Sequence, residues 1–146
     1  MGMTIQEIQD EIIGEFEYLG DWEEKYEYII SLGRELAPYP AEYRDEGHRV
    51  KGCQSQVWLH GEVENGRMHL AADSDAMIPK GLVSMILRIF QDQPVDEIAS
   101  ANLYFLDRIG LANHLSPTRS NGLASMVKKI NELAILKGVT GRQQDE

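Results

Sequence analysis

The chain contains one cysteine, Cys53, and this residue is the strongest candidate for chemistry in the sequence. A lone cysteine is usually a small buried hydrophobic residue. Cys53, however, follows Gly52 and precedes Gln54 and Ser55, where a predicted strand begins rather than on an apolar stripe. Glycine permits backbone conformations that other residues avoid and lets a neighbouring segment approach closely. Cys53 is therefore a candidate reactive thiol, with a buried structural thiol as the alternative.

Two basic residues, Arg49 and Lys51, precede this cysteine and predict an electropositive setting for its sulfur. Positive charge favours the thiolate over the thiol, and the thiolate is the nucleophile. Because the chain has one cysteine, an internal disulfide, a CxxC redox pair and a cysteine-rich zinc or iron–sulfur site are excluded within a single chain.

The histidines are scattered and show no close ligand pairing, so we expect no metal site. Of the four, His114 is a candidate for assisting proton transfer, with a structural hydrogen bond as the alternative. Arg119 lies beside the first turn of a predicted helix, where a basic residue is unfavourable against the helix dipole. That position indicates a role such as fixing a carboxylate, the loop of Cys53 or a partner.

Three further residues have two interpretations each. Asp73 and Asp75 end a predicted strand and cap the helix that follows, or they contact a partner. Trp58 falls on the outer face of the predicted sheet, where it packs against a helix or loop, or contacts a partner.

Length and composition predict one domain over residues 1–146, with an ordered core from about residue 4 to 138. No apolar run reaches the length of a membrane span and no secretory signal is present, so we expect a cytoplasmic protein. Residues 1–47 carry thirteen Asp and Glu against three Lys and Arg, which accounts for the net charge of -10. Such an acidic segment argues against nucleic acid as a partner. It is either a solvated helix face or a surface that steers a basic partner.

Apolar residues at three- and four-residue spacing predict helices over residues 4–19, 21–36, 76–91 and 117–138. Shorter helical pieces are expected from Pro94 and over residues 105–111. Asp21 and Glu24 have the spacing of a capping box, and Gly138 is expected to end the last helix. The polar residues 139–146 are expected to form a disordered tail.

Residues 54–64 alternate between apolar and polar side chains, as a strand does, and residues 67–72 return as a second strand. Asn65 and Gly66 between them form the preferred pair for a type I′ turn. Two strands alone are marginally stable, so helices must cover the apolar face. The sequence therefore predicts an α+β fold, in which a small antiparallel sheet of about three strands, built on this hairpin, is covered by helices.

Four blocks of sequence carry a resemblance that extends over roughly residues 5–137. They are 21–26 (DWEEKY), 50–58 (VKGCQSQVW), 72–76 (ADSDA) with 80–82 (KGL), and 114–123 (HLSPTRSNGL). In this order they resemble the SufE family of sulfur-acceptor proteins. The family fold is similar to that of IscU-type iron–sulfur scaffold proteins, which carry several metal-ligating cysteines. Because this chain has one cysteine, the carrier function is favoured over the scaffold function.

The resemblance implies a specific activity. Family members take the terminal sulfur of a persulfide on a cysteine desulfurase of the SufS type, increase its turnover, and pass the sulfur to an iron–sulfur scaffold complex. The family's acceptor cysteine matches Cys53, which would carry the persulfide as a covalent intermediate. The remaining candidates divide into supporting residues (Gly52, Gln54, Ser55, His114 and Arg119) and partner contacts (Lys51, Trp58, Asp73 and Asp75). The chain is expected to need no cofactor, because pyridoxal phosphate belongs to the desulfurase, and to show no independent turnover. A homodimer is a further candidate assembly.

Two alternatives stay open at this point. One is a paralogous acceptor that serves another desulfurase and delivers sulfur to tRNA modification. The other is a single-cysteine thiol redox sensor or peroxidase, for which the sequence offers no supporting motif. For a carrier, we expect Cys53 to point inward from a loop, against an apolar pocket, and to be largely shielded, because an exposed persulfide would be reduced before delivery.

Overall fold

The structure of the chain is a computed structural model that describes residues 2–53, 55–115 and 117–145. For residues 112, 117–121 and 138–145 it describes the backbone alone. The elements in chain order are α1 (Ile5–Glu17), α2 (Trp22–Arg34), the 3-10 turns η1 (Ala41–Tyr43) and η2 (Glu46–His48), β1 (Val57–Glu64), β2 (Arg67–Ser74), α3 (Met77–Phe90), α4 (Val95–Ala99), α5 (Phe105–Arg108), the 3-10 turn η3 (Leu111–His114) and α6 (Pro117–Asp145).

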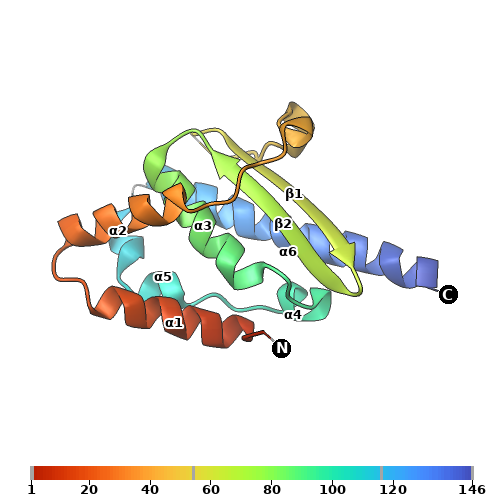
Figure 1. The fold of residues 1–146 in the computed structure, drawn as a ribbon, viewed down its shortest axis with the longest axis horizontal. Coiled ribbons are helices and arrows are strands. Elements are labelled where there is room, and N and C mark those ends of the chain that lie inside the picture. Colours follow the sequence, from red (N-terminus) through yellow and green to blue (C-terminus); the bar gives the residue numbers. More distant parts are fainter. Residues whose placement is uncertain (1, 54, 116, 146) are drawn as a thin grey trace.

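Helix α3 forms the centre of the molecule (Figure 1). It contacts α1 and α2 on one side and β2 and α6 on the other. Its apolar side chains are buried almost all around the helix, as the sequence predicted from their distribution. Two of them, Ile86 and Phe90, are 0% exposed. The α+β class is therefore confirmed, with the hairpin lying against α3 and α6.

Capping side chains start the first two helices. The Thr4 hydroxyl accepts a hydrogen bond from the Glu7 amide at 3.1 Å, and the Glu7 carboxylate accepts one from the Thr4 amide at 3.0 Å. Asp21 caps α2 by accepting from the Glu24 amide at 2.9 Å. The Glu24 carboxylate reaches back one residue further than in a standard capping box, to the Gly20 amide at 2.7 Å.

The hairpin has the turn that the sequence predicted. The two strands are antiparallel. Val57 pairs with Ser74 at the open end of the hairpin, and Glu64 pairs with Arg67 next to the turn. Asn65 and Gly66 have φ values of 54° and 75°, the positive values that a type I′ turn requires. The inner face buries apolar side chains from both strands (Val57, Leu59, Met68, Leu70 and Ala72).

The sheet has two strands within the described residues, so the expectation of about three strands is corrected. Non-strand groups take the edge positions instead. At β2, the Gln91 side-chain amide donates to the Leu70 carbonyl and accepts from the Leu70 amide, both at 2.7 Å. At β1, the Val50 amide donates to the Val57 carbonyl at 2.8 Å, and Arg49 forms an isolated bridge with Trp58.

Helix α6 runs behind the hairpin and continues to Asp145 (Figure 1). The prediction that Gly138 ends this helix is wrong, and residues 139–145 are helical where a disordered tail was expected. Gly138 and Gly141 each cost a helix only about 1 kcal/mol, and Arg142, Gln143 and Gln144 beyond them are good helix formers. Within the described part of the chain, no helix has both the length and the apolar character needed to cross a membrane.

Candidate functional site

Cys53 lies on the loop between η2 and β1, with its sulfur against the start of α6. Its Sγ atom is 3.5 Å from the Gly122 carbonyl oxygen, to which the thiol donates. A Cβ atom at Gly122 would lie 3.3 Å from Sγ and 3.7 Å from the Cys53 Cα, so a larger residue there would press on the cysteine. Gly122 falls in one of the blocks that carry the family resemblance, but this contact was not predicted, because it depends on tertiary packing.

Gly52 allows the backbone to reach that position. Its φ is 90°, in the region that favours glycine, and a Cβ atom there would lie 2.7 Å from the Ser125 hydroxyl oxygen. Both reasons for a glycine that were expected from the sequence, an unusual backbone conformation and a close neighbour, are present. The loop is also fixed on the far side of the cysteine, because Gln56 and Asp75 exchange two hydrogen bonds, one between backbones at 3.2 Å and one to the Asp75 carboxylate at 3.0 Å.

The environment of the sulfur is apolar rather than cationic. Cys53 is half-buried and packs against the hydrophobic core. Burial raises the pKa of the Cys53 thiol. The expectation that Arg49 and Lys51 favour the thiolate is therefore wrong for the free protein. Arg49 instead pairs with Glu46 at 3.0 Å, and Lys51 is exposed. The cysteine packs against the core from a loop, but it is half-buried and lines neither cavity on α6, where a largely shielded thiol against an apolar pocket was expected.

The segment that leads to Cys53 folds over the outer face of the hairpin. Arg44 pairs with the Asp73 carboxylate at 2.5 Å, and its guanidinium lies 4.5 Å from the centre of the Trp58 ring. Tyr43 stacks on His60 with ring centres 3.6 Å apart. Trp58 and Asp73 are directly opposite in the sheet, so Arg44 joins both strands. We call this set of contacts, made by Tyr43, Arg44, Trp58, His60 and Asp73, the clasp.

Asp73 is held as a carboxylate by this arrangement. Burial raises its pKa, but hydrogen bonds from Arg44 and the Ser74 amide, together with the charge of Lys80 at 3.3 Å, outweigh burial and hold the pKa below its usual value. The prediction that Asp73 and Asp75 cap the next helix is wrong. The cap position of α3 is Ala76, which supplies no side-chain hydrogen bond, and Asp75 bonds Gln56 instead.

The other predicted site residues are not gathered around the sulfur. Trp58 is buried, 8% exposed, beneath Arg44, which agrees with the packing interpretation. His114 stacks on Trp22 with ring centres 3.6 Å apart, and its carbonyl accepts from the Tyr26 hydroxyl at 2.7 Å. Ser55 lies two residues beyond Cys53 and is half-buried. Gln54 and the Arg119 side chain lie outside the described residues.

Two cavities lie along α6, and the lining of neither includes Cys53. One, of about 480 Å³, lies between the loop residues Glu46, Gly47 and 49–51 and one face of α6 formed by Ser125, Lys128, Lys129 and Glu132. We call it the basic groove. Each of its α6 residues is three or four positions from two of the others, so the four lie on one face of the helix. This polar face was not predicted from the sequence.

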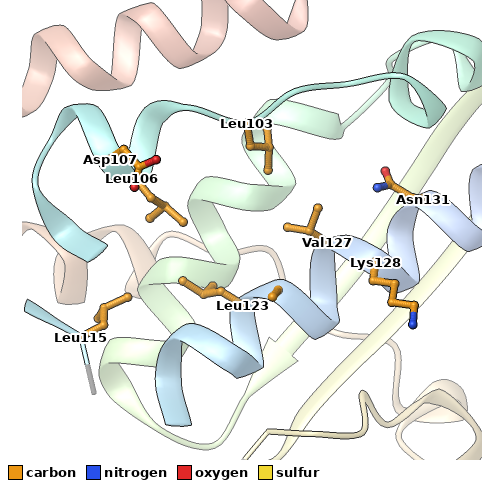
Figure 2. Close-up of a pocket in the computed structure, with 9 residues that line it drawn as sticks. Leu103, Leu106, Asp107, Leu115, Leu123, Val127, Lys128 and Asn131 are labelled. Carbon is orange, nitrogen blue, oxygen red and sulfur yellow. The ribbon is translucent and has the colours of Figure 1, made fainter. Parts of the chain in front are cut away.

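The second cavity, of about 460 Å³, lies between α6 and the segment around α5 (Figure 2). Its walls are mostly leucine and valine side chains (Leu103, Leu106, Leu115, Leu123 and Val127). Cys53 does not line it. Among the described residues, no group of three or more His, Cys, Asp or Glu side chains is arranged to hold a metal ion.

Comparison with known proteins agrees with this picture. Residues 10–134 match the SufE family, whose domain is described as Fe-S metabolism associated. An uncharacterised SufE-like protein of Rhizobium etli is 45% identical over 130 residues, which cover 86% of this chain and 88% of that protein. A second, from Rhizobium meliloti, is 40% identical over 130 residues, with 86% and 93% of the two chains covered.

The fold is similar to a solution structure of a hypothetical protein from Thermus thermophilus, with a TM-score of 0.74 and 18% identity. That likeness covers 89% of this chain and 95% of the other, and at such identity it bears on the fold alone. Since the family match extends over most of the chain and two relatives are at least 40% identical to it over 130 residues, the chain belongs to the SufE family of Fe–S metabolism associated proteins.

Proposed function

We propose that the protein is a sulfur acceptor and carrier, which takes persulfide sulfur from a pyridoxal-phosphate cysteine desulfurase onto Cys53. It stimulates that desulfurase and passes the sulfur to an iron–sulfur scaffold complex. The observation that carries the proposal is the position of the single cysteine in a SufE chain. Cys53 lies on a loop, half-buried, with its sulfur against the backbone of α6.

The transfer is a thiol exchange at sulfur. The Cys53 thiolate attacks the outer sulfur of the donor persulfide, a new sulfur–sulfur bond forms, and the bond to the donor cysteine breaks. The donor cysteine leaves as a thiolate and takes up the proton that Cys53 released. No electrons are gained or lost overall, so the step needs neither an oxidant nor a cofactor on this chain.

Two properties of the site suit a carrier. The chain offers no second cysteine to resolve the persulfide into an internal disulfide. Packing against the core limits the access of water and small thiols to the sulfur. Because burial also raises the pKa of the thiol, the free protein should be a slow nucleophile. Reaction then requires the desulfurase to draw the loop outward, and this ordering belongs to the proposal.

Mass spectrometry tests the proposal directly. Incubated with its desulfurase, pyridoxal phosphate and free cysteine, the protein should gain the mass of at least one sulfur atom, and a reductant should remove it. Cys53→Ser should fold normally, gain no mass and fail to stimulate the desulfurase. Normal stimulation by Cys53→Ser would contradict covalent transfer. Comparing several desulfurases distinguishes a SufS-type donor from one that serves tRNA modification, and turnover of peroxide would favour a redox enzyme instead.

A further inference from the structure

The basic groove has a charge opposite to that of the chain as a whole. It is lined by four cationic side chains and two carboxylates, whereas the protein carries a net charge of -10. One of the carboxylates, Glu46, is paired with Arg49 at 3.0 Å. Lys51, Lys128 and Lys129 are exposed and form no ion pair within the described part of the chain. The second carboxylate, Glu132, offsets one of these three lysines, so the four cations and two carboxylates leave the groove with a net charge of +2.

This charge lies beside the sulfur-bearing loop. Lys51 is two residues before Cys53, and Ser125 belongs both to the wall of the groove and to the contact with Gly52. The Lys128 side chain points away from Leu103 and Leu106, so its ammonium does not enter the apolar cavity (Figure 2). A molecule that fills the groove would touch both walls between which Cys53 is held.

The size and lining of the groove define what fits it. At about 480 Å³ it exceeds the space that one inorganic anion fills. Its lining is polar apart from Val50, which argues against an apolar ligand. Lysine ammonium groups are mobile point charges, which accept carboxylates in several arrangements. Nucleic acid is disfavoured by the acidic surface of the first third of the chain.

We infer that the basic groove docks an acidic segment of the protein that delivers sulfur to Cys53. The identity of the partner rests on the proposed function, whereas the charge and position of the groove rest on the described residues. Docking there places an acidic surface next to the loop that must open. Lysines at the rim of an interface set the association rate and its salt dependence.

Charge reversal tests the inference. In the Lys128→Glu, Lys129→Glu double variant, the affinity for the desulfurase that loads Cys53 should fall by roughly tenfold at low salt, and much less at high salt. The matched control is Arg34→Glu with Arg108→Glu, which changes the net charge equally on α2 and α5 and should leave affinity near the wild-type value. Equal affinities for the groove variant and wild type, or equal losses in groove variant and control, would overturn the inference.

Two further measurements separate this inference from the proposed function. Alkylation of Cys53 by the uncharged reagent iodoacetamide should be as slow in the groove variant as in wild type, because the thiol and its packing are unaltered. A faster rate would indicate a damaged fold, and binding would then be measured with Lys51→Glu. If no desulfurase loads wild-type Cys53, a labelled oligoglutamate peptide serves as the probe. Binding that the groove variant loses and the control keeps supports the inference, and a wild-type protein that does not bind the peptide overturns it.

Discussion

Cys53 combines two properties that would oppose each other in the sulfur carrier proposed above. Packing against the core would protect a bound sulfur, but the same burial raises the pKa of the thiol and reduces the fraction of reactive thiolate. The sequence singled out this residue because it is the one cysteine and follows a glycine. Its basic neighbours suggested an activated thiolate, and that expectation failed because Arg49 is paired with Glu46 and the sulfur faces α6.

The first prediction concerns the reactivity of this thiol. Cys53 should react with iodoacetamide several-fold more slowly in the folded protein than in the unfolded chain near pH 8, and the midpoint of its pH profile should lie at higher pH. Adding the desulfurase should raise the rate. The measurement is alkylation followed over time by mass spectrometry. Identical profiles for folded and unfolded protein would indicate a thiol that is already exposed.

The second prediction concerns Gly52. Replacing it with alanine should destabilise the fold by roughly 1–3 kcal/mol, because φ is positive and the new Cβ atom meets Ser125. The displaced loop should also make Cys53 faster to alkylate. Ser125→Ala removes the hydroxyl without changing the backbone, so it should recover part of the stability when combined with Gly52→Ala. Thermal unfolding of the two single variants and the double variant measures this coupling, and strict additivity would contradict the contact.

At the scale of elements, the clasp links the chain that precedes Cys53 to the hairpin. Arg44 reaches Trp58 and Asp73 on opposite strands, and Tyr43 covers His60. Residues 39–49 thus act as a cover for the outer face of a sheet that would otherwise expose a tryptophan. The cover fixes the direction in which the loop approaches α6.

The third prediction tests the clasp through Asp73. Asp73→Asn should lower the free energy of unfolding by about 1 kcal/mol at pH 7, because it removes the charge that Arg44 and Lys80 neutralise. The pKa of Asp73 is lower in the folded than in the unfolded state, so its contribution exists above the ordinary carboxyl pKa and is lost as the pH falls. The difference in the free energy of unfolding between the variant and wild type should therefore become smaller below about pH 4.

Denaturant titrations at several pH values provide the measurement. Glu46→Gln is the control, because the Glu46 side chain is 85% exposed in its pair with Arg49 and should contribute little. If the free energies of unfolding of Asp73→Asn and wild type differ by the same amount from pH 7 to pH 3, the charge of Asp73 is not what stabilises the clasp.

Local sequence signals predicted those elements that depend on local chemistry. Apolar spacing located α1, α2 and α3, and the Asn65–Gly66 pair located the turn, because caps, periodicity and turn conformation are set by nearby residues. Contacts between distant segments were not predictable. Nothing in the spacing of residues indicated that Gln91 would replace a third strand, that Gly122 would meet Cys53, or that Arg44 would cover Trp58.

At the scale of the whole molecule, two glycines set how closely the helices approach. A Cβ atom at Gly81 in α3 would lie 2.0 Å from the Ile29 carbonyl oxygen of α2, and one at Gly33 would lie 2.9 Å from the Gly81 amide nitrogen. The two helices therefore touch through their backbones. The acidic first third is also partly used inside the fold, because Arg88 of α3 pairs with Glu11 and Glu15 of α1.

The fourth prediction follows from this helix contact. Gly81→Ala should destabilise the protein by about 3 kcal/mol or more, because backbone atoms would have to separate to admit the methyl group. Gly14→Ala in α1 is the matched control, since nothing lies within 4 Å of its added Cβ atom. The free energy of unfolding of that variant should rise by roughly 0.5–1 kcal/mol, because alanine has a higher helix propensity than glycine. Similar unfolding temperatures for the two variants would contradict the close packing of α2 and α3.

The occupied edges of the hairpin bear on how the protein behaves at high concentration. Free backbone groups along a strand are a template onto which another chain can polymerise. Here the Gln91 amide and residues 92–93 bond β2 at Leu70 and Met68, and Val50 bonds β1 at Val57. At these positions the backbone groups of the two edges are already bonded and are not open to strand exchange between molecules. Fibril growth through these positions of the sheet is thereby discouraged.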